Sequence, residues 1–228
     1  MIKKIRVAIL EDHQSIVDGY LYRLEKDPQI EVTAMMGFGD ELEPTLEKTP
    51  VDVLLLDVNV PTSNENKNPY PILHVLPRLL QAHPDLNILV ISMHAERGLI
   101  RAVMDAGANG YILKDDQSVL KDLGSVVKSV AAGGIQFSQT AHNLYSKYLS
   151  SETNNLTPRQ LEVLSLCTAY PDASTGELAE KMNVTNSTIR NLLSGAYFKL
   201  DVHNRAGAIA KAQQLGLITP HQSEFPKP

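Results

Sequence analysis

The stretch VDVLLLDVNVP, residues 51–61, decides how the first half of the chain folds. Five of its first six residues are Val or Leu, as is typical of a strand buried on both faces of a parallel sheet. The run ends at Asp57, and Asn59 follows two residues later. The stretch therefore predicts a central strand that delivers a carboxylate to one edge of the sheet.

Composition indicates a protein of two ordinary domains. The chain has 228 residues, 43% of them hydrophobic, and a net charge of −5. Its single cysteine, Cys167, lies among apolar residues at helical spacing, so we expect a buried small side chain rather than a nucleophile, a ligand or a disulfide partner. The apolar run near the start ends at Glu11, too early for a signal peptide, and no run approaches the roughly 18 apolar residues that span a membrane. We therefore expect a soluble, cytoplasmic protein without a membrane partner.

Strand and helix signals alternate through the first 135 residues. Five βα units of this kind indicate an open parallel sheet with helices on both faces, the last helix covering QSVLKDLGSVVKSVAAGG, residues 117–134. In such sheets the ligand site lies beyond the carboxyl ends of the strands. The predicted strands are residues 5–10, 30–35, 51–56, 87–92 and 110–113.

Polar residues follow four of these strands and are expected to converge on one edge. Three carboxylates together would repel each other, at about 3 kcal/mol for each pair at about 5 Å and an effective dielectric constant near 20. Mg²⁺ prefers carboxylate and phosphate oxygens and removes that repulsion. We therefore expect Mg²⁺ as a cofactor. The residues at the strand ends are Glu11, Asp12, Asp57, Ser92 and Lys114.

This combination can accept a phosphoryl group. Asp57 would act as the nucleophile, Mg²⁺ and Lys114 would neutralise the transferring oxygens, and the Ser92 hydroxyl would donate a hydrogen bond to the product. Each residue alone has an ordinary explanation: Asp57 or Ser92 as a turn or cap residue, Lys114 as a solvated charge. Capping does not explain the joint order of two acids, one acid, hydroxyl and lysine, so the set favours a phosphoryl-transfer site.

The motifs ILEDH, LLLDVNVP, LVISMH and GYILKD resemble the receiver domain of two-component response regulators over roughly residues 3–135. The resemblance implies a flavodoxin-like, doubly wound parallel sheet. It also implies that Tyr111 is the aromatic switch residue, which turns inward as Ser92 moves toward the phosphate; the alternative is a half-buried strand tyrosine. By this resemblance the phospho-acceptor is Asp57, the Mg²⁺ ligands are Glu11, Asp12, Asp57 and the backbone carbonyl of Asn59, and the phosphate is bound by Ser92 and Lys114.

One segment departs from the family pattern. TSNENKNPYP, residues 62–71, replaces the short turn that usually follows the acceptor strand, and Pro77 is expected to interrupt the helical run after it. The segment could be a lid, a contact for a particular partner, or a tolerated surface insertion, and the last is the default.

From about residue 136 the pattern is helical only. SQTAHNLYSKYL, residues 138–149, predicts a connecting helix, and SSETNN, residues 150–155, a polar linker. Two capping boxes follow, Thr157 with Gln160 and Ser174 with Glu177. Later helices are expected at 186–200 and 204–215, the second stopped by Gly216. The predicted division is a receiver at 1–135, a connecting helix and linker at 136–155, a second domain at 156–220 and a tail at 221–228.

Helices at about 175–182 and 186–200 form a helix-turn-helix candidate, and the segment resembles the LuxR-type DNA-binding domain, a module of four helices. Together the two halves resemble a NarL-type response regulator. The resemblance implies transcription regulation, with a sensor histidine kinase and double-stranded DNA as partners and a homodimer as the active form.

In the second helix of this pair, an apolar stripe at helical spacing is expected to face the core of its own domain. Leu192 and the helix expected at 204–215 are candidate dimer surfaces, and Gly195 is either a tolerated surface glycine or a point of close approach. The stripe contains Ile189, Leu193, Ala196 and Leu200. The predicted DNA contacts are Thr188, Arg190, Asn191, Ser194 and Lys199.

Three function classes remain open. The leading hypothesis is a DNA-binding regulator controlled by phosphorylation of Asp57. A phosphohydrolase is disfavoured because no second acid lies beside Asp57 at 57–59. We therefore expect self-phosphorylation and slow dephosphorylation without enzymatic turnover. His94 is a candidate for tuning the rate at which the phosphoryl group is lost. The alternative is an atypical regulator with the same fold that works without phosphorylation or through protein contacts.

Overall fold

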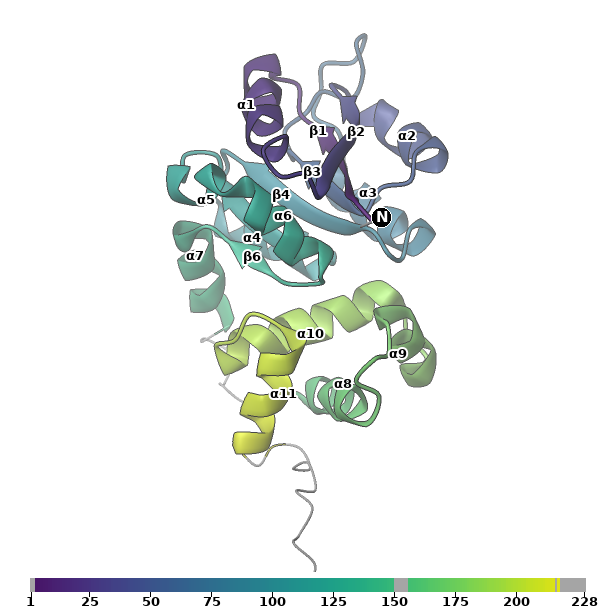
Figure 1. The fold of residues 1–228 in the computed structure, drawn as a ribbon, viewed down its shortest axis with the longest axis vertical. Coiled ribbons are helices and arrows are strands. Elements are labelled where there is room, and N and C mark those ends of the chain that lie inside the picture. Colours follow the sequence, from purple (N-terminus) through teal and green to yellow (C-terminus); the bar gives the residue numbers. More distant parts are fainter. Residues whose placement is uncertain (1–2, 150–155, 216, 218–228) are drawn as a thin grey trace, which may run out of the picture.

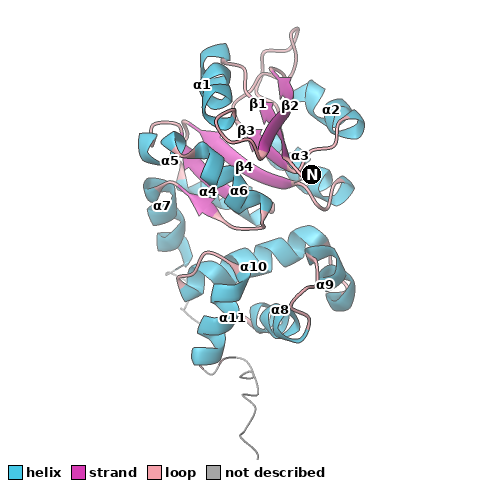
Figure 2. Cartoon of the chain, viewed as in Figure 1, coloured by secondary structure: helices cyan, strands magenta, loops and turns pink. Residues whose placement is uncertain are grey.

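The computed structural model describes residues 3–149, 156–215 and 217, and it places a sheet domain against a helical domain (Figure 1). The sheet has the strand order β2-β1-β3-β4-β5-β6, and every neighbouring pair is parallel (Figure 2). The predicted polar linker, Gly216 and the predicted tail lie outside the described residues. The strands are β1 Ile5–Leu10, β2 Ile30–Met36, β3 Val53–Leu56, β4 Asn87–Ser92, β5 Gly110–Leu113 and β6 Gln136–Phe137.

Strand β3 is central, as the opening stretch predicts. It lies between β1 and β4, and all four of its residues are buried. Leu54 and Leu56 belong to one apolar cluster, while Val53 and Leu55 belong to the other, as expected for side chains that alternate across a sheet. Helices cover both faces, so the predicted doubly wound α/β fold is confirmed. The elements on the two faces are α1 Gln14–Leu24, η1 Gly39–Glu41, α2 Leu42–Lys48, α3 Ile72–Ala82, α4 Arg97–Asp105, α5 Gln117–Lys121 and α6 Leu123–Ala131.

Two helix predictions are wrong, and one strand was not predicted. The single helix expected at 117–134 is divided at Asp122 into α5 and α6. Helix α3 continues through Pro77, because the hydrogen bond that proline cannot donate would go to the carbonyl of Leu73, an exposed residue that water can reach. The two-residue strand β6 pairs with β5 and matches Phe137 to Tyr111.

The segment after Pro61 folds as a short hairpin rather than an open loop. Pro61 and Pro69 form an antiparallel bridge. The hairpin is anchored to the end of β2, since Gly39 N donates to Pro61 O at 2.9 Å and the Tyr70 ring covers Gly39. A Cβ atom at Gly39 would lie 2.0 Å from that ring, so glycine permits the contact. These contacts fix one side of the hairpin to η1, and its role as a lid, a partner contact or a surface insertion stays a prediction.

The remaining helices form the connection and the second domain. Both predicted capping boxes are present: Gln160 N donates to Thr157 Oγ1 at 3.3 Å, and Glu177 N donates to Ser174 Oγ at 3.2 Å. Cys167 is buried, as predicted. Among the described residues, no helix combines the length and the apolar character needed to cross a membrane. The helices are α7 Gln139–Leu149, α8 Pro158–Ala169, α9 Thr175–Met182, α10 Asn186–Leu200 and α11 Arg205–Gln214.

Candidate functional site

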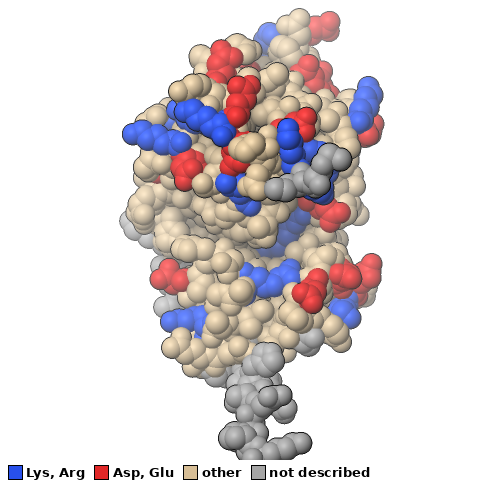
Figure 3. Space-filling model, in the orientation of Figure 1, with Lys and Arg blue, Asp and Glu red and all other residues tan. Residues whose placement is uncertain are grey.

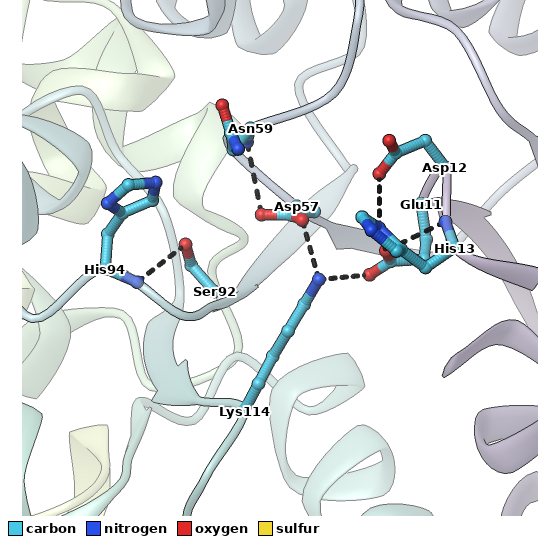
Figure 4. A network of polar contacts seen from close by, with 8 residues as sticks. All are labelled: Glu11, Asp12, His13, Asp57, Asn59, Ser92, His94 and Lys114. Atoms are coloured by element: carbon cyan, nitrogen blue, oxygen red, sulfur yellow. Dashed lines mark hydrogen bonds and ion pairs between the residues drawn. The ribbon is translucent and has the colours of Figure 1, made fainter. Parts of the chain in front are cut away.

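The carboxyl edge of the sheet holds a buried cation between two carboxylates (Figure 4). Lys114, which follows β5, places Nζ 2.6 Å from Asp57 Oδ2 and 2.6 Å from Glu11 Oε2. All three residues are buried, with 9%, 6% and 3% of the surfaces of Lys114, Asp57 and Glu11 exposed. Parallel strands end on the same side of a sheet, which is why residues far apart in the sequence meet here. The structure thus brings the predicted acceptor and the predicted lysine into direct contact.

The ion pairs control the charge of Lys114. Burial alone would lower the pKa of its ammonium group, but the hydrogen bond to Asp57 and the contact with Glu11 outweigh burial and raise that pKa above its ordinary value. Lys114 is therefore charged at neutral pH. Because it neutralises one of the two buried carboxylates, the pocket keeps a net negative charge that a divalent cation would compensate.

Oxygen ligands suitable for a metal lie beside this pair. The side chains of Glu11, Asp12 and His13 each offer an atom within 4.8 Å of the others. His13 Nδ1 lies 2.8 Å from Asp12 Oδ1 and 3.2 Å from Glu11 Oε1, so the two carboxylates turn toward each other. Carboxylate oxygens are the ligands that Mg²⁺ prefers, and the partial exposure of Asp12 leaves room for the waters that Mg²⁺ retains. The residues present therefore fit Mg²⁺.

Asn59 and Ser92 lie on the side of the acceptor away from Glu11 (Figure 4), and Tyr111 contacts the loop after β4. Asn59 N donates to Asp57 Oδ1 at 3.1 Å. Ser92 is fully buried, and its Oγ accepts from His94 N at 3.2 Å (Figure 4). Tyr111 is also fully buried rather than half-buried, and its hydroxyl donates to His94 O at 2.7 Å; burial raises the pKa of Tyr111 to about 12. In this structure Tyr111 points inward and Ser92 is engaged with the loop after β4.

Helix α10 lies against the sheet domain rather than open to solvent (Figure 1). The Arg190 guanidinium donates to the backbone carbonyls of Pro84 and Leu86, and the Asn191 amide donates to the carbonyl of Asp105. Burial lowers the pKa of Arg190 to about 10. Two predicted base-reading side chains are thus bound to the loop before β4 and to the last residue of α4.

The backbone of Gly107 permits this close approach. Its φ of +102° is one that side chains disfavour, and a Cβ atom there would lie 2.9 Å from Leu80 Cδ1 and 3.5 Å from Ser187 Cβ on α10. Nearby, Asn186 Nδ2 donates to Pro84 O at 2.9 Å. The interface is therefore specified by backbone groups of the sheet domain as well as by α10.

Four rings join the other end of α10 to the sheet domain. Phe198 meets Phe137 and Tyr145 edge to face at centroid distances of 4.8 and 4.6 Å, and it stacks on His142 at 5.4 Å. Aromatic pairs in these geometries contribute beyond their buried area. These four residues, which we name the aromatic latch, connect β6 and α7 with the helical domain.

Comparison with known proteins decides the family. The response regulator receiver domain matches residues 7–123, and the domain of bacterial regulatory proteins of the luxR family matches residues 154–212. The chain belongs to the response regulators. It is 30% identical to the transcriptional regulatory protein DegU of Brevibacillus brevis, over 94% of this chain and 95% of DegU. It is 29% identical to DesR of Bacillus subtilis, over 93% of this chain and 98% of DesR.

Solved structures agree in fold. RcsB of Salmonella enterica serovar Typhimurium, bound to a promoter in the presence of the phosphomimetic BeF3−, matches with a TM-score of 0.57 and 23% identity over 92% of this chain and 98% of RcsB. At this identity the likeness concerns the fold alone.

The other predicted DNA contacts of the response regulator are distributed around α10. Thr188 takes part in the cap of α10, with its Oγ1 2.8 Å from Thr185 Oγ1. Ser194 is buried beside a 450 Å³ cavity between the domains that Arg190 also lines, and Lys199 is partly buried near the end of the helix. On the face shown in Figure 3 the helical domain presents no continuous basic patch. The assignment of these residues to DNA stays a prediction.

The aromatic latch was not predicted from the sequence. The chain has only four Phe, and Phe198 lies outside the apolar stripe that α10 turns toward its own domain. A large aromatic residue off the main stripe could have indicated that α10 has a second protein surface to cover.

Gly195 is a point of helix contact rather than a tolerated surface glycine. It is buried, and a Cβ atom there would lie 2.5 Å from Gln160 Nε2 of α8. The Gln160 side chain is held in place because its Oε1 accepts from Thr157 N at 2.9 Å in the capping box. Glycine at 195 therefore lets α8 and α10 approach with the box intact.

This contact gives a prediction about stability. In the wild type, Gly195→Ala should not stabilise the protein, because the gain of about 1 kcal/mol in helix propensity is offset by displacement of Gln160. In a Gln160→Ala background, which has no side chain to displace, the same change should stabilise by about 1 kcal/mol. Urea unfolding of the four proteins measures the difference. Equal effects of Gly195→Ala in both backgrounds would show that Gln160 does not restrict this position.

Proposed function

We propose that this response regulator binds DNA as a transcription regulator and is controlled by phosphorylation of Asp57, with a sensor histidine kinase as donor. The observation that carries the proposal is that Arg190 and Asn191 hydrogen-bond to the backbone of the sheet domain. A helix that reads base edges must present such side chains to the major groove, so α10 cannot hold these contacts and DNA together. The structure therefore represents a closed form, and phosphorylation shifts the population toward an open one.

The chemistry at Asp57 is the transfer of a phosphoryl group from the donor's phosphohistidine nitrogen. The P–N bond breaks, a bond forms from phosphorus to an Asp57 carboxylate oxygen, and the histidine nitrogen takes up a proton. Glu11, Asp12, Asp57 and the Asn59 carbonyl would hold Mg²⁺, which supplies positive charge next to the transferred oxygens. Lys114 exchanges its contact with Asp57 Oδ2 for a phosphoryl oxygen, and the Ser92 hydroxyl leaves the loop after β4 to donate to another.

The reaction is stoichiometric. Asp57 is phosphorylated once, and the bond between the phosphoryl group and the carboxylate is then slowly hydrolysed. We therefore propose no enzymatic turnover on a free substrate. Release of α10 from the receiver exposes its DNA-reading face, and two copies then bind a two-fold site. A regulator that binds DNA acts where the DNA is, which in bacteria is the cytoplasm.

Replacing Asp57 with Asn tests the proposal. Acetyl phosphate with Mg²⁺ should add one phosphoryl group to the wild type, detected by intact mass, and should raise its affinity for DNA selected from a random pool by about tenfold, within the usual range of allosteric coupling. Asp57→Asn should show neither change, because it has no carboxylate to phosphorylate. Asp115→Asn, which alters an exposed carboxylate next to Lys114, is the matched control and should behave as the wild type.

The same experiment distinguishes the proposed function from the alternative, a regulator that works without phosphorylation. A wild type that gains no mass yet binds the selected DNA would be a regulator that works without phosphorylation. Equal stimulation of Asp57→Asn and wild type would place the input elsewhere in the chain.

A further inference from the structure

Tyr20 on α1 carries a buried hydroxyl that nothing in the described structure satisfies. Only 4% of the residue is exposed, and the hydroxyl has no hydrogen-bond partner among the described residues. Buried polar groups are nearly always paired, so each exception calls for an explanation. A phenylalanine would fill the same space without leaving a polar atom unpaired.

Tyr20 belongs to the apolar cluster that packs α1 against the sheet. It packs in the same apolar cluster as Ile9 and Leu55, which come just before the ends of β1 and β3. Side chains on a helix tilt toward its N-terminus, and α1 begins at Gln14, two residues after Asp12 of the pocket. This tilt favours a hydroxyl directed along α1 toward the carboxyl edge of the sheet.

Electrostatics agree with this direction. Burial is the main reason that the pKa of Tyr20 is raised, and the negative charges of Glu11 and Asp57 raise it further, against a smaller opposing effect of Arg23. The phenol is therefore neutral at physiological pH and available as a donor, in a place that the pocket's charges reach.

Glu11 offers a matching acceptor. Its side chain is 1% exposed, and its Oε2 lies 2.6 Å from the Lys114 ammonium. The pocket thus contains one buried donor without a partner, the Tyr20 hydroxyl, and one buried acceptor whose partner is the Lys114 ammonium. Lys114 holds Glu11 in the present arrangement.

We propose that Tyr20 is a positioning residue of the acceptor pocket, whose hydroxyl donates to the Glu11 carboxylate when bound Mg²⁺ has displaced Lys114 from Glu11. The hydrogen bond would fix the orientation of one metal ligand, as groups behind ligating carboxylates commonly do. Removing such a group generally changes metal affinity by about 10- to 100-fold. The identity of the acceptor pocket rests on the proposed function, but displacement of Lys114 from Glu11 by Mg²⁺ requires no phosphoryl transfer.

The test is Tyr20→Phe in the full-length protein, with Tyr22→Phe as the matched control. Tyr22 lies on the same helix but is 66% exposed, so the control removes the same atom outside the pocket. Calorimetric titration with Mg²⁺ alone should show affinity about tenfold weaker for Tyr20→Phe and unchanged for Tyr22→Phe. Without Mg²⁺, thermal unfolding of Tyr20→Phe should occur at the same temperature as the wild type or higher, because the substitution removes an unpaired buried hydroxyl.

The outcomes separate this inference from the proposed function. Unchanged Mg²⁺ affinity in Tyr20→Phe, or no Mg²⁺ binding by the wild type, would overturn the role of Tyr20. A lower unfolding temperature without Mg²⁺ would also overturn it, since the hydroxyl would then have a structural partner already. If the wild type binds Mg²⁺ about tenfold more tightly than Tyr20→Phe but accepts no phosphoryl group from acetyl phosphate, the proposed function fails while the role of Tyr20 stands.

Discussion

Replacing Phe198 with Ala should raise the DNA affinity of the unphosphorylated protein by about one to two orders of magnitude. The ring contributes little to the apolar stripe of α10 and instead closes the aromatic latch with Phe137, His142 and Tyr145. Truncating a buried Phe costs about 3–5 kcal/mol, and this partly buried ring should cost somewhat less. Most of that loss falls on the closed form, because in the open form the ring is exposed to solvent.

Population arithmetic converts this loss into affinity. The apparent dissociation constant equals the intrinsic constant divided by the fraction of open protein, so each 1.4 kcal/mol removed from the closed form improves binding about tenfold until the open form dominates. Fluorescence anisotropy with DNA selected by the phosphorylated wild type measures the change. Small-angle scattering should show a larger radius of gyration for Phe198→Ala without DNA.

Two further variants make this result specific. Tyr145→Ala removes the latch from the receiver side and should act in the same direction. Tyr170→Ala removes an aromatic ring that is 46% exposed and lies outside the latch, so it should leave the affinity unchanged. If neither Phe198→Ala nor Tyr145→Ala strengthens DNA binding, the latch is not the cause of closure. If Tyr145→Ala strengthens binding while Phe198→Ala weakens it, the latch still closes the protein, but Phe198 is also required by the DNA-bound form itself.

Strand-end chemistry was predictable because it depends on local patterns and on one topological rule. The apolar run before Asp57 identifies the central strand, and parallel strands must end on the same side, so Glu11 and Lys114 had to lie near it. The capping boxes at Thr157 and Ser174 depend only on residues three apart. In each case the sequence contains both partners, and their spacing or their position at a strand end indicates that they meet.

The interface between the domains depends on information of another kind. Arg190 and Asn191 carry donors that suit a base edge and a backbone carbonyl equally, so their chemistry does not distinguish DNA from the receiver. Strand β6 has only two residues, too few for a periodic signal, yet it brings Phe137 to Phe198. The break at Asp122 was missed because the run 117–134 contains no proline, although the weak helix formers Asp122 and Gly124 lie at the break.

Replacing Lys114 with Met should cause a larger loss of stability than any surface substitution, about 3–5 kcal/mol at pH 7. The change keeps most of the length of the side chain and removes the cation between the Asp57 and Glu11 carboxylates, which are 6% and 3% exposed. Because the pKa of Lys114 is raised, its contribution is complete below the unfolded-state value of about 10.4 and is lost only at higher pH. Urea unfolding at pH 7 therefore measures that contribution in full.

Mg²⁺ should reverse much of this loss. The two buried carboxylates of Lys114→Met lack a cation, so the metal should stabilise the variant more than the wild type, in which the ammonium competes for the same oxygens. Removing one carboxylate should have a similar effect, and Lys114→Met with Asp57→Asn should therefore be more stable than Lys114→Met alone. The exposed Lys121→Met on α5 is the control and should change stability by less than about 0.5 kcal/mol, with no response specific to Mg²⁺.

A loss below about 1 kcal/mol in Lys114→Met would contradict this account, because it is the size expected of a solvent-exposed ion pair. Equal stabilisation of variant and wild type by Mg²⁺ would show that the ammonium does not occupy part of the cation site. If both expected results are obtained, Lys114 is a built-in counter-ion that keeps the acceptor pocket folded before the metal arrives. Mg²⁺ that displaces the ammonium from Glu11 would then take that carboxylate as a ligand, which is the same step that frees Glu11 for the hydroxyl of Tyr20.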